Sequence, residues 1–251
     1  MLKGKSENKI VMSNVRHHKV HGAVLGALCF ILGITMPVCA KMKDPDKKTT
    51  GADYYILNES TNGNPGEVSA KLQNTESIIV IPEEVTINGK IYIVTEITGL
   101  NYADTVDKGL KHDSFKNRKN DVTEKIVLPR TIKTIQKGAF SNYTKLKTIE
   151  INPENPHFIF KEGAVLSNDG KTLYGTITLK KSYTVPKGVK KIEDRAFAYS
   201  RVKSVILPKS CNKIGDRAFY RCSKLKRVKR LDKVKTIGEG AFWGSRIKNS
   251  K

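Results

Sequence analysis

Three segments near the C-terminus repeat one another almost without gaps. Each ends on an Ala-Phe pair, and the phenylalanines Phe197, Phe219 and Phe242 follow one another at intervals of 22 and 23 residues. Pro186 and Pro208 repeat at the same interval of 22 residues. A period of about 20–29 residues, in which a short apolar alternation precedes a bend, is typical of a solenoid whose coils bury their apolar faces against one another.

Each repeat is expected to contribute one short strand. In Leu146-x-x-Ile149-x-Ile151 and Val202-x-x-Val205-x-Leu207 the apolar side chains point inward. Proline ends the strand because it lacks an amide donor, and the Phe of the Ala-Phe pair fills the coil from a tight helical turn. The pattern predicts a β-rich leucine-rich-repeat solenoid of short parallel strands and tight helical turns, with four clear coils and a fifth that carries an insertion.

The repeats resemble the BspA-like leucine-rich-repeat family, whose pattern is L-x-x-I-x-[IL]-P-x-x-[VL]-x-x-I-G-x-x-A-F-x-x-C. The resemblance covers residues 122–251 and includes the interruption Asn155-Pro156-His157-Phe158, followed by Asp169-Gly170-Lys171. Residues 53–99 are similar to the family's N-terminal module. The resemblance implies a cell-surface protein of a host-associated microbe, because some members are adhesins for extracellular-matrix proteins or other cells.

A β-hairpin is predicted upstream of the repeats. Asn88-Gly89 separates two apolar runs, and this dipeptide tolerates the positive φ angles of a type I′ turn. We expect the hairpin to cap the first coil. The predicted organisation is a signal peptide at 1–40, an N-terminal β capping module with a polar insertion at 41–121, and the solenoid at 122–251. Inside the polar insertion, the spacing from Leu110 to Phe115 equals that from the Ile to the Phe of each repeat. We interpret this segment as a decayed coil.

The first 40 residues have the layout of an export signal. Basic residues 16–19 precede an apolar run at 23–34, and Val38-x-Ala40 fits the positions that signal peptidase reads, so cleavage is expected after Ala40. The run is shorter than the roughly 20 residues of a membrane span, so we expect no span in the mature chain, with an uncleaved anchor as the alternative. Translation could start at Met1 or at Met12.

The cysteines point to small core residues. Cys39 stands where a lipoprotein would be acylated, but Val38 and Met36 depart from that pattern, so lipid attachment is not favoured. Cys222 occupies the column of Ser200 and Ser245. Cys211 occupies another column half a coil away, so a disulfide between them would exceed the permitted separation. Free, buried thiols are therefore predicted.

A search for catalytic motifs nominates no residue. His112 and His157 are isolated, and neither Cys-x-x-Cys nor His-Glu-x-x-His nor Gly-x-Ser-x-Gly occurs. Coils that touch only their neighbours rarely bring distant residues together. We therefore predict that the protein is not an enzyme and that it binds neither a cofactor nor a metal. The alternative is a hydrolase, for which the sequence offers no candidate residues.

Charge suggests where a ligand binds. The chain has 46 Lys and Arg against 24 Asp and Glu, and without residues 1–40 it keeps 41 against 23, a net charge of +18. Stacking the coils is expected to align basic side chains in two columns as candidate ligand-binding residues: Lys145, Arg201 and Lys224 in one, and Lys147, Lys203 and Lys226 in the other. A protein or an anionic glycan is the expected ligand. The alternative is a solvated Lys-rich face.

The surface also carries acidic residues, and other functions are compatible with it. Asp194, Asp216 and Glu239 align beside Arg195 and Arg217, which suggests mutually offsetting surface charges. Nucleic acid is disfavoured by the export signal. A structural envelope or secreted scaffold, or a fragment of a longer repeat protein, is the alternative function. The oligomeric state and the choice between secretion and surface attachment stay open.

Overall fold

The computed structural model describes residues 45–49, 51–61, 63–73, 75–98, 122–141, 143–177 and 181–247. The chain divides into two units, residues 1–42 and 43–251, and the fold below is that of the second. The predicted leader with Ala40 and Cys39 lies outside the described residues, as does the segment Leu110–Phe115.

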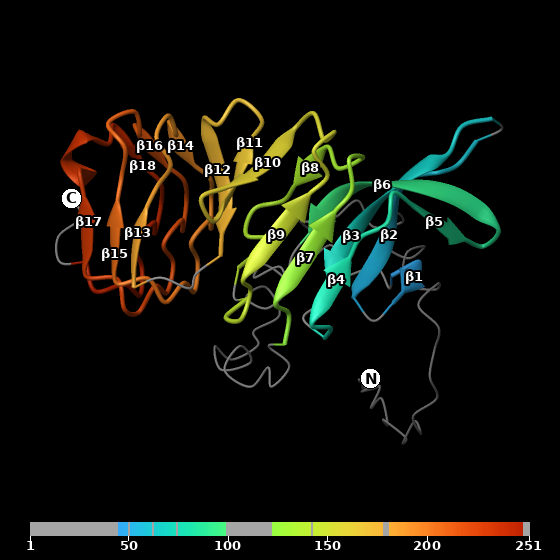
Figure 1. Cartoon of the computed structure of the whole chain (residues 1–251), viewed down its shortest axis with the longest axis horizontal. Helices are drawn as coiled ribbons and strands as arrows, with labels where there is room; N and C mark the ends of the chain where they lie inside the picture. Colours follow the sequence, from blue (N-terminus) through green and yellow to red (C-terminus); the bar gives the residue numbers. More distant parts are fainter. Residues whose placement is uncertain are drawn as a thin grey trace, which may run out of the picture. The chain divides into compact units, whose positions relative to one another are not determined.

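Two lines of short parallel strands run along the coils. The first line forms two sheets, one ordered β4-β7-β9 and the other β13-β15-β17. Figure 1 shows these strands following one another in sequence order, from β4 in cyan to β17 in red. Their bounds are β4 Ile78–Val80, β7 Lys125–Leu128, β9 Thr148–Ile151, β13 Ser182–Thr184, β15 Ser204–Ile206 and β17 Arg227–Lys229.

The second line consists mainly of two-residue strands after the bend of each coil. β8 pairs in parallel with the end of β6, and β14, β16 and β18 continue in parallel from β12. Their bounds are β6 Lys90–Thr98, β8 Thr134–Ile135, β12 Thr172–Thr176, β14 Lys191–Ile192, β16 Lys213–Ile214 and β18 Thr236–Ile237. With one strand from each line per coil, the described residues form six coils. The sequence showed five, and the additional coil is built by β4 and the end of β6.

The N-terminal module is a mixed sheet. Its order is β1-β2-β3-β6-β5, and its remaining strands are β1 Lys47–Lys48, β2 Ala52–Asn58, β3 Gly66–Leu72 and β5 Glu84–Ile87. β5 and β6 form the predicted hairpin, with Asn88 at φ 52° and Gly89 at φ 77°. Its role as a cap remains a prediction, because β6 also supplies the second strand of the first coil.

The insertion divides the solenoid. β10 Phe158–Lys161, β11 Ala164–Ser167 and β12 form an antiparallel meander between β9 and β13. Asn155 anchors the start of this meander: its side-chain Nδ2 donates to the backbone oxygens of Pro129, Arg130 and Ile132 at 3.0–3.3 Å. Its Oδ1 accepts from the backbone N–H groups of His157 and Phe158, both at 2.8 Å. Asn155 thus ties the insertion to the preceding coil.

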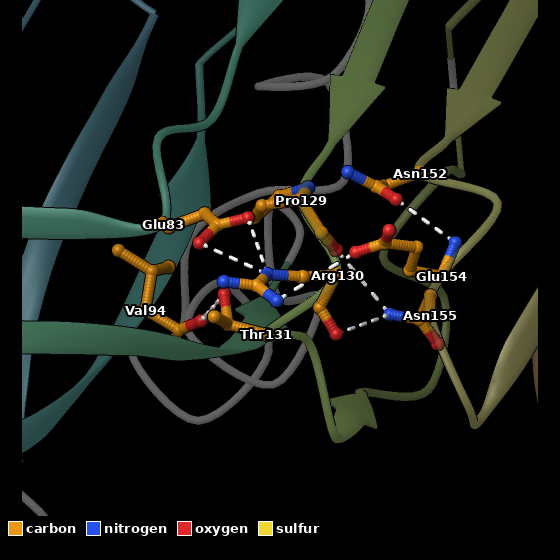
Figure 2. A network of polar contacts seen from close by, with 8 residues as sticks. All are labelled: Glu83, Val94, Pro129, Arg130, Thr131, Asn152, Glu154 and Asn155. Carbon is orange, nitrogen blue, oxygen red and sulfur yellow. Dashed lines mark hydrogen bonds and ion pairs between the residues drawn. The ribbon is translucent and has the colours of Figure 1, made fainter.

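Figure 2 shows the polar contacts around this joint. Arg130 reaches Glu83 at 3.0 Å on one side and Glu154 at 3.6 Å on the other. The hydroxyl of Thr131 donates to the backbone oxygen of Val94 at 2.7 Å. The bend after β7 is therefore held both to the N-terminal module and to the insertion.

The core follows the predicted repeat columns. Phe197, Phe219 and Phe242 lie inside successive coils, and their rings stack with centroids 4.7 and 5.2 Å apart. The turns that carry them are isolated i→i+3 hydrogen-bonded turns, since residues in the left-handed region, Arg195 at φ 58° and Tyr199 at φ 63°, interrupt any helix. The short helix described in this unit is a 3-10 helix, η2 Leu231–Lys233.

The last described coil packs less tightly than those before it. Val228, Val234 and Ile237 are half-buried, whereas the matching residues of the preceding coil are buried. Arg230 aligns with Leu207 in the repeat, but it does not share the inward position of that buried leucine. Its φ of 65° turns the chain, the side chain is exposed, and Leu231 packs against the core instead.

Candidate functional site

The sheet β13-β15-β17 places one lysine before each of its strands. The backbone N–H of Lys203 donates to the oxygen of Lys181 at 2.8 Å, and that of Lys226 donates to the oxygen of Lys203 at 2.9 Å. These three residues, here called the lysine column, therefore stand in register on adjacent coils, about 4.8 Å apart. All three side chains are exposed. Lys181 was missed by sequence reasoning, although aligning Tyr183 with Val205 would have found it.

Four of the six predicted ligand-binding residues belong to this region. Lys203 and Lys226 are in the lysine column, and Arg201 and Lys224 lie two positions before them, exposed on the same adjacent coils. Lys145 and Lys147 are exposed as well, but they precede β9 in the other sheet. The insertion separates the two sheets, so the predicted six-residue alignment is interrupted there.

Lys147 also differs in its electrostatic surroundings. Its Nζ lies 2.6 Å from the carboxylate of Glu124, which precedes the strand of the neighbouring coil. Within the described part of the chain, by contrast, no ion pair involves the lysine column, Arg201 or Lys224. The positive charge of these five residues is therefore not offset by an ion pair among the described residues.

The excess charge is concentrated at one end of the unit. Residues 201–247 contain fourteen Lys and Arg against three Asp and Glu, whereas residues 45–98 contain four against eight. The electrostatic field of these cations attracts anions to the C-terminal coils. At ordinary salt concentrations this field is screened over about 8–10 Å.

The carboxylates Asp194 and Asp216 hold coils together, a role that goes beyond the predicted offsetting of surface charges. Oδ1 of Asp194 accepts from the backbone N–H of Asp216 at 3.0 Å, and Oδ1 of Asp216 accepts from that of Glu239 at 2.9 Å. Lys137 approaches the other oxygen of Asp194 at 2.6 Å. Burial acts to raise the pKa of Asp194, but these hydrogen bonds outweigh it and lower that pKa.

The predicted free thiols are confirmed. Cys211 and Cys222 are unpaired and buried, and Sγ of Cys222 donates to the backbone oxygen of Phe197 at 3.0 Å. Burial raises the pKa of Cys222 to about 12 and that of Cys211 to about 11. Both thiols are therefore protonated and act as small core side chains.

Two further properties of the described residues bear on function. Among them, no group of three or more His, Cys, Asp and Glu side chains is placed to hold a metal ion. Likewise, none of the helices found there has the length and apolar character needed to cross a membrane.

Comparison with known proteins identifies the repeat. The profile of the "BspA type Leucine rich repeat region" matches residues 108–161 and 169–251 in six copies. The match begins inside the polar insertion, close to Leu110. No curated protein matches the chain significantly.

Several solved structures are similar to this chain. A leucine-rich repeat protein from Eubacterium ventriosum is 20% identical over 66% of this chain, with a TM-score of 0.48, and this chain spans 39% of its length. The pneumococcal vaccine antigen PcpA is 16% identical, with 82% of this chain and 81% of that protein covered and a TM-score of 0.42. A leucine rich cell surface protein from Faecalibacterium prausnitzii is 16% identical, with 79% of each chain covered and a TM-score of 0.40.

Proposed function

Because this chain belongs to the family of BspA-type leucine-rich-repeat proteins, we propose that it is an exported, non-enzymatic binding protein of the cell surface. Solenoids of stacked repeats present long continuous surfaces on which partners bind. The proposal includes cleavage after Ala40 and the division into a leader at 1–40, a capping module at 41–121 and the solenoid at 122–251.

The ligand we propose is anionic: a sulfated glycan or the acidic face of a host matrix protein. The observation that carries this choice is the lysine column. Three exposed ammonium groups stand on adjacent coils with no carboxylate partner among the described residues, in a segment with fourteen cations and three anions. Like charges this close repel one another, and a multivalent anion relieves that repulsion.

Binding to immobilised heparin or to matrix proteins tests the ligand. The protein is expected to bind the sulfated glycan, and its affinity is expected to fall as salt rises. Replacing Arg201, Lys203, Lys224 and Lys226 by Ser should weaken binding by about tenfold or more. The double variant Lys145→Ser/Lys147→Ser should have a smaller effect, because Lys147 is already paired with Glu124. Absence of binding at low salt would overturn the proposal.

Localisation is tested on intact cells. Protease treatment should release fragments of residues 41–251 from the surface, whereas an internal protein would be protected. Mass spectrometry of the mature N-terminus should show whether the chain begins at Lys41. A start at any residue of the leader would contradict cleavage after Ala40.

A structural scaffold remains the second candidate function, and one observation favours it. The acidic N-terminal module and the basic C-terminal coils carry opposite charges, an arrangement suited to head-to-tail association of copies. Sedimentation at low and high salt separates the two functions. Assemblies that dissociate as salt rises indicate a scaffold, and a monomer that binds heparin indicates a ligand-binding protein.

A further inference from the structure

A groove lies at the strand ends opposite the lysine column. Each strand of the sheet β13-β15-β17 is followed by a bend, and the bends after β13 and β15 contain Pro-Lys-Gly and Pro-Lys-Ser. The backbone N–H of Val189 donates to the oxygen of Pro186, and that of Cys211 donates to the oxygen of Pro208, so the two bends share this hydrogen bond, although only the first has a positive φ, 100° at Gly188. Lys187 and Lys209 therefore occupy equivalent exposed positions on adjacent coils.

The third cation of the groove comes from a different position of the next coil. The residue equivalent to Lys187 and Lys209 is Asp232, which pairs with Lys233 at 3.4 Å. Arg230 supplies the third cation instead, because its left-handed backbone turns its side chain back toward the preceding coil. There its Nη1 donates to the backbone oxygen of Leu207 at 2.6 Å. The guanidinium is thereby fixed at the edge of the groove.

The floor of the groove is apolar and its rim is positive. The volume is about 610 Å³. Half-buried Pro208 provides exposed apolar surface at the floor, and Val185 and Leu207, each 1% exposed, line the groove from the core side. Lys187, Lys209 and Arg230 line the rim, and Glu162 is the one carboxylate in the lining. Ion pairs of the described residues do not reach any of these three cations.

We propose that this groove binds a short acidic saccharide, a sugar whose ring carries a sulfate or a carboxylate. The C–H face of a pyranose ring would cover the apolar floor, and its anionic group would contact Lys187, Lys209 and Arg230. The hydroxyl of Thr184, at the edge of the groove, supplies a further polar contact for a sugar. The volume lies within the range of about 300–1,000 Å³ that is usual for small-molecule sites.

Two simpler ligands fit less well. A bare inorganic anion would pair with the cations but would not use the apolar floor, and a neutral sugar would cover the floor but leave three positive charges without a partner. The groove therefore favours a ligand that has both an anionic group and an apolar face. This inference goes beyond the proposed function because the groove is separate from the lysine column. Lys203 directly precedes β15, and Lys209 lies in the bend after it, so the two lysines stand at opposite ends of that strand.

Titration of the isotope-labelled protein, followed by NMR of the methyl groups, tests the groove. The probes are a sulfated heparin disaccharide, digalacturonate, the neutral disaccharide galactobiose and inorganic sulfate. We expect the methyl signals of Val185 and Leu207 to shift with one or both acidic saccharides. The two acidic probes distinguish sulfate from carboxylate as the preferred group. Equal affinity for inorganic sulfate or for the neutral disaccharide, or no shift with either acidic saccharide, would overturn the proposal.

Charge-matched variants give the control. Lys187→Ser/Lys209→Ser should lower the affinity for the acidic disaccharide by about tenfold or more, whereas Lys190→Ser/Lys213→Ser, which removes two exposed cations outside the groove, should change it less than about twofold. Replacement of the lysine column by Ser should also leave disaccharide affinity unchanged while weakening heparin binding. Failure of the groove and failure of the proposed function are thus distinguishable. Equal losses in the groove variant and its control would show that only net charge matters.

Discussion

The carboxylate of Asp194 accepts a hydrogen bond from the backbone N–H of Asp216, 22 residues later in the chain, at 3.0 Å. Asp216 repeats the same contact with Glu239 on the next coil at 2.9 Å. These bonds run between coils, at bends that the parallel strands do not reach. Asp194 and Asp216 thus add polar side-chain contacts to the backbone ladders and apolar columns that join neighbouring coils.

Removing this carboxylate should destabilise the solenoid. Asp194→Ala leaves the N–H of Asp216 without its acceptor and Lys137 without its partner, and a hydrogen bond to a charged group contributes about 2 kcal/mol. The free energy of unfolding in urea measures the loss. Asp232→Ala is the control, since that exposed carboxylate has only a surface pair with Lys233 and should cost less than about 0.5 kcal/mol. Equal losses in the two variants would contradict a role between coils.

The same carboxylate links stability to pH. Burial raises the pKa of Asp194, but the hydrogen bonds from Lys137 and Asp216 prevail and hold that pKa below its ordinary value of 3.8. A carboxyl whose pKa is lower in the folded than in the unfolded protein stabilises the folded state at pH values above the unfolded-state pKa. This contribution is lost as the pH falls through the folded-state pKa. The wild type should therefore be more stable than Asp194→Asn at neutral pH, and the difference should shrink below 3.8. Urea unfolding across the pH range measures it; a constant difference would refute the linkage.

The asparagine at the start of the insertion should be among the most sensitive positions. Asn155→Ala leaves three backbone oxygens and two N–H groups without their side-chain partner, in a residue that is 4% exposed. A loss of about 3 kcal/mol or more is expected from unsatisfied buried groups. Asn155→Asp keeps the acceptor but loses the donors, so it should also destabilise. Exposed Asn212→Ala serves as the control in thermal and urea unfolding, and similar losses at both positions would refute the role of Asn155.

The apolar columns were predictable because each coil repeats the same residue at the same place. Phe197, Phe219 and Phe242 could be assigned to the interior from spacing alone. The alignment of Lys145 and Lys147 with the C-terminal lysines was less secure, because register across the insertion depends on how residues 152–177 fold. A new sheet begins at β13, after that meander. The repeat therefore continues in the sequence, but the hydrogen-bonded ladder of β4, β7 and β9 does not continue into β13.

The aspartate contacts and the groove were not predictable from patterns of residue type. Whether Asp194 points to solvent or to the next coil depends on the backbone position of Asp216, which the repeat does not specify. Gly215 and Gly238 were nevertheless a signal in the sequence. Each directly precedes the residue, Asp216 or Glu239, whose backbone N–H donates to the aspartate of the preceding coil. The groove depends on the left-handed backbone of Arg230, which no neighbouring coil shares at that position.

Gly215 should tolerate no side chain. A Cβ there would lie 2.2 Å from Oδ1 of Asp194 and 2.6 Å from its backbone nitrogen. Gly215→Ala must therefore displace either the carboxylate or the coil, and a loss of about 3 kcal/mol is expected from overpacking together with the broken hydrogen bond. Ser223→Ala, at an exposed turn, is the control. A Gly215→Ala protein with wild-type stability in urea would show that the coils are not in this close contact.

The two thiols of the C-terminal coils should report on folding. In a background of Cys29→Ser/Cys39→Ser, only Cys211 and Cys222 remain to react with a thiol reagent such as 5,5′-dithiobis(2-nitrobenzoic acid). Thiolate is the reacting form, and burial raises the two pKa values to about 11 and about 12, so the native protein should react very slowly near neutral pH. Both thiols should be labelled at once in urea. Cys222→Ser places a hydroxyl where Ser200 and Ser245 already stand and should fold normally. If native Cys222 reacted as fast as the unfolded chain, its placement inside the coil would be wrong.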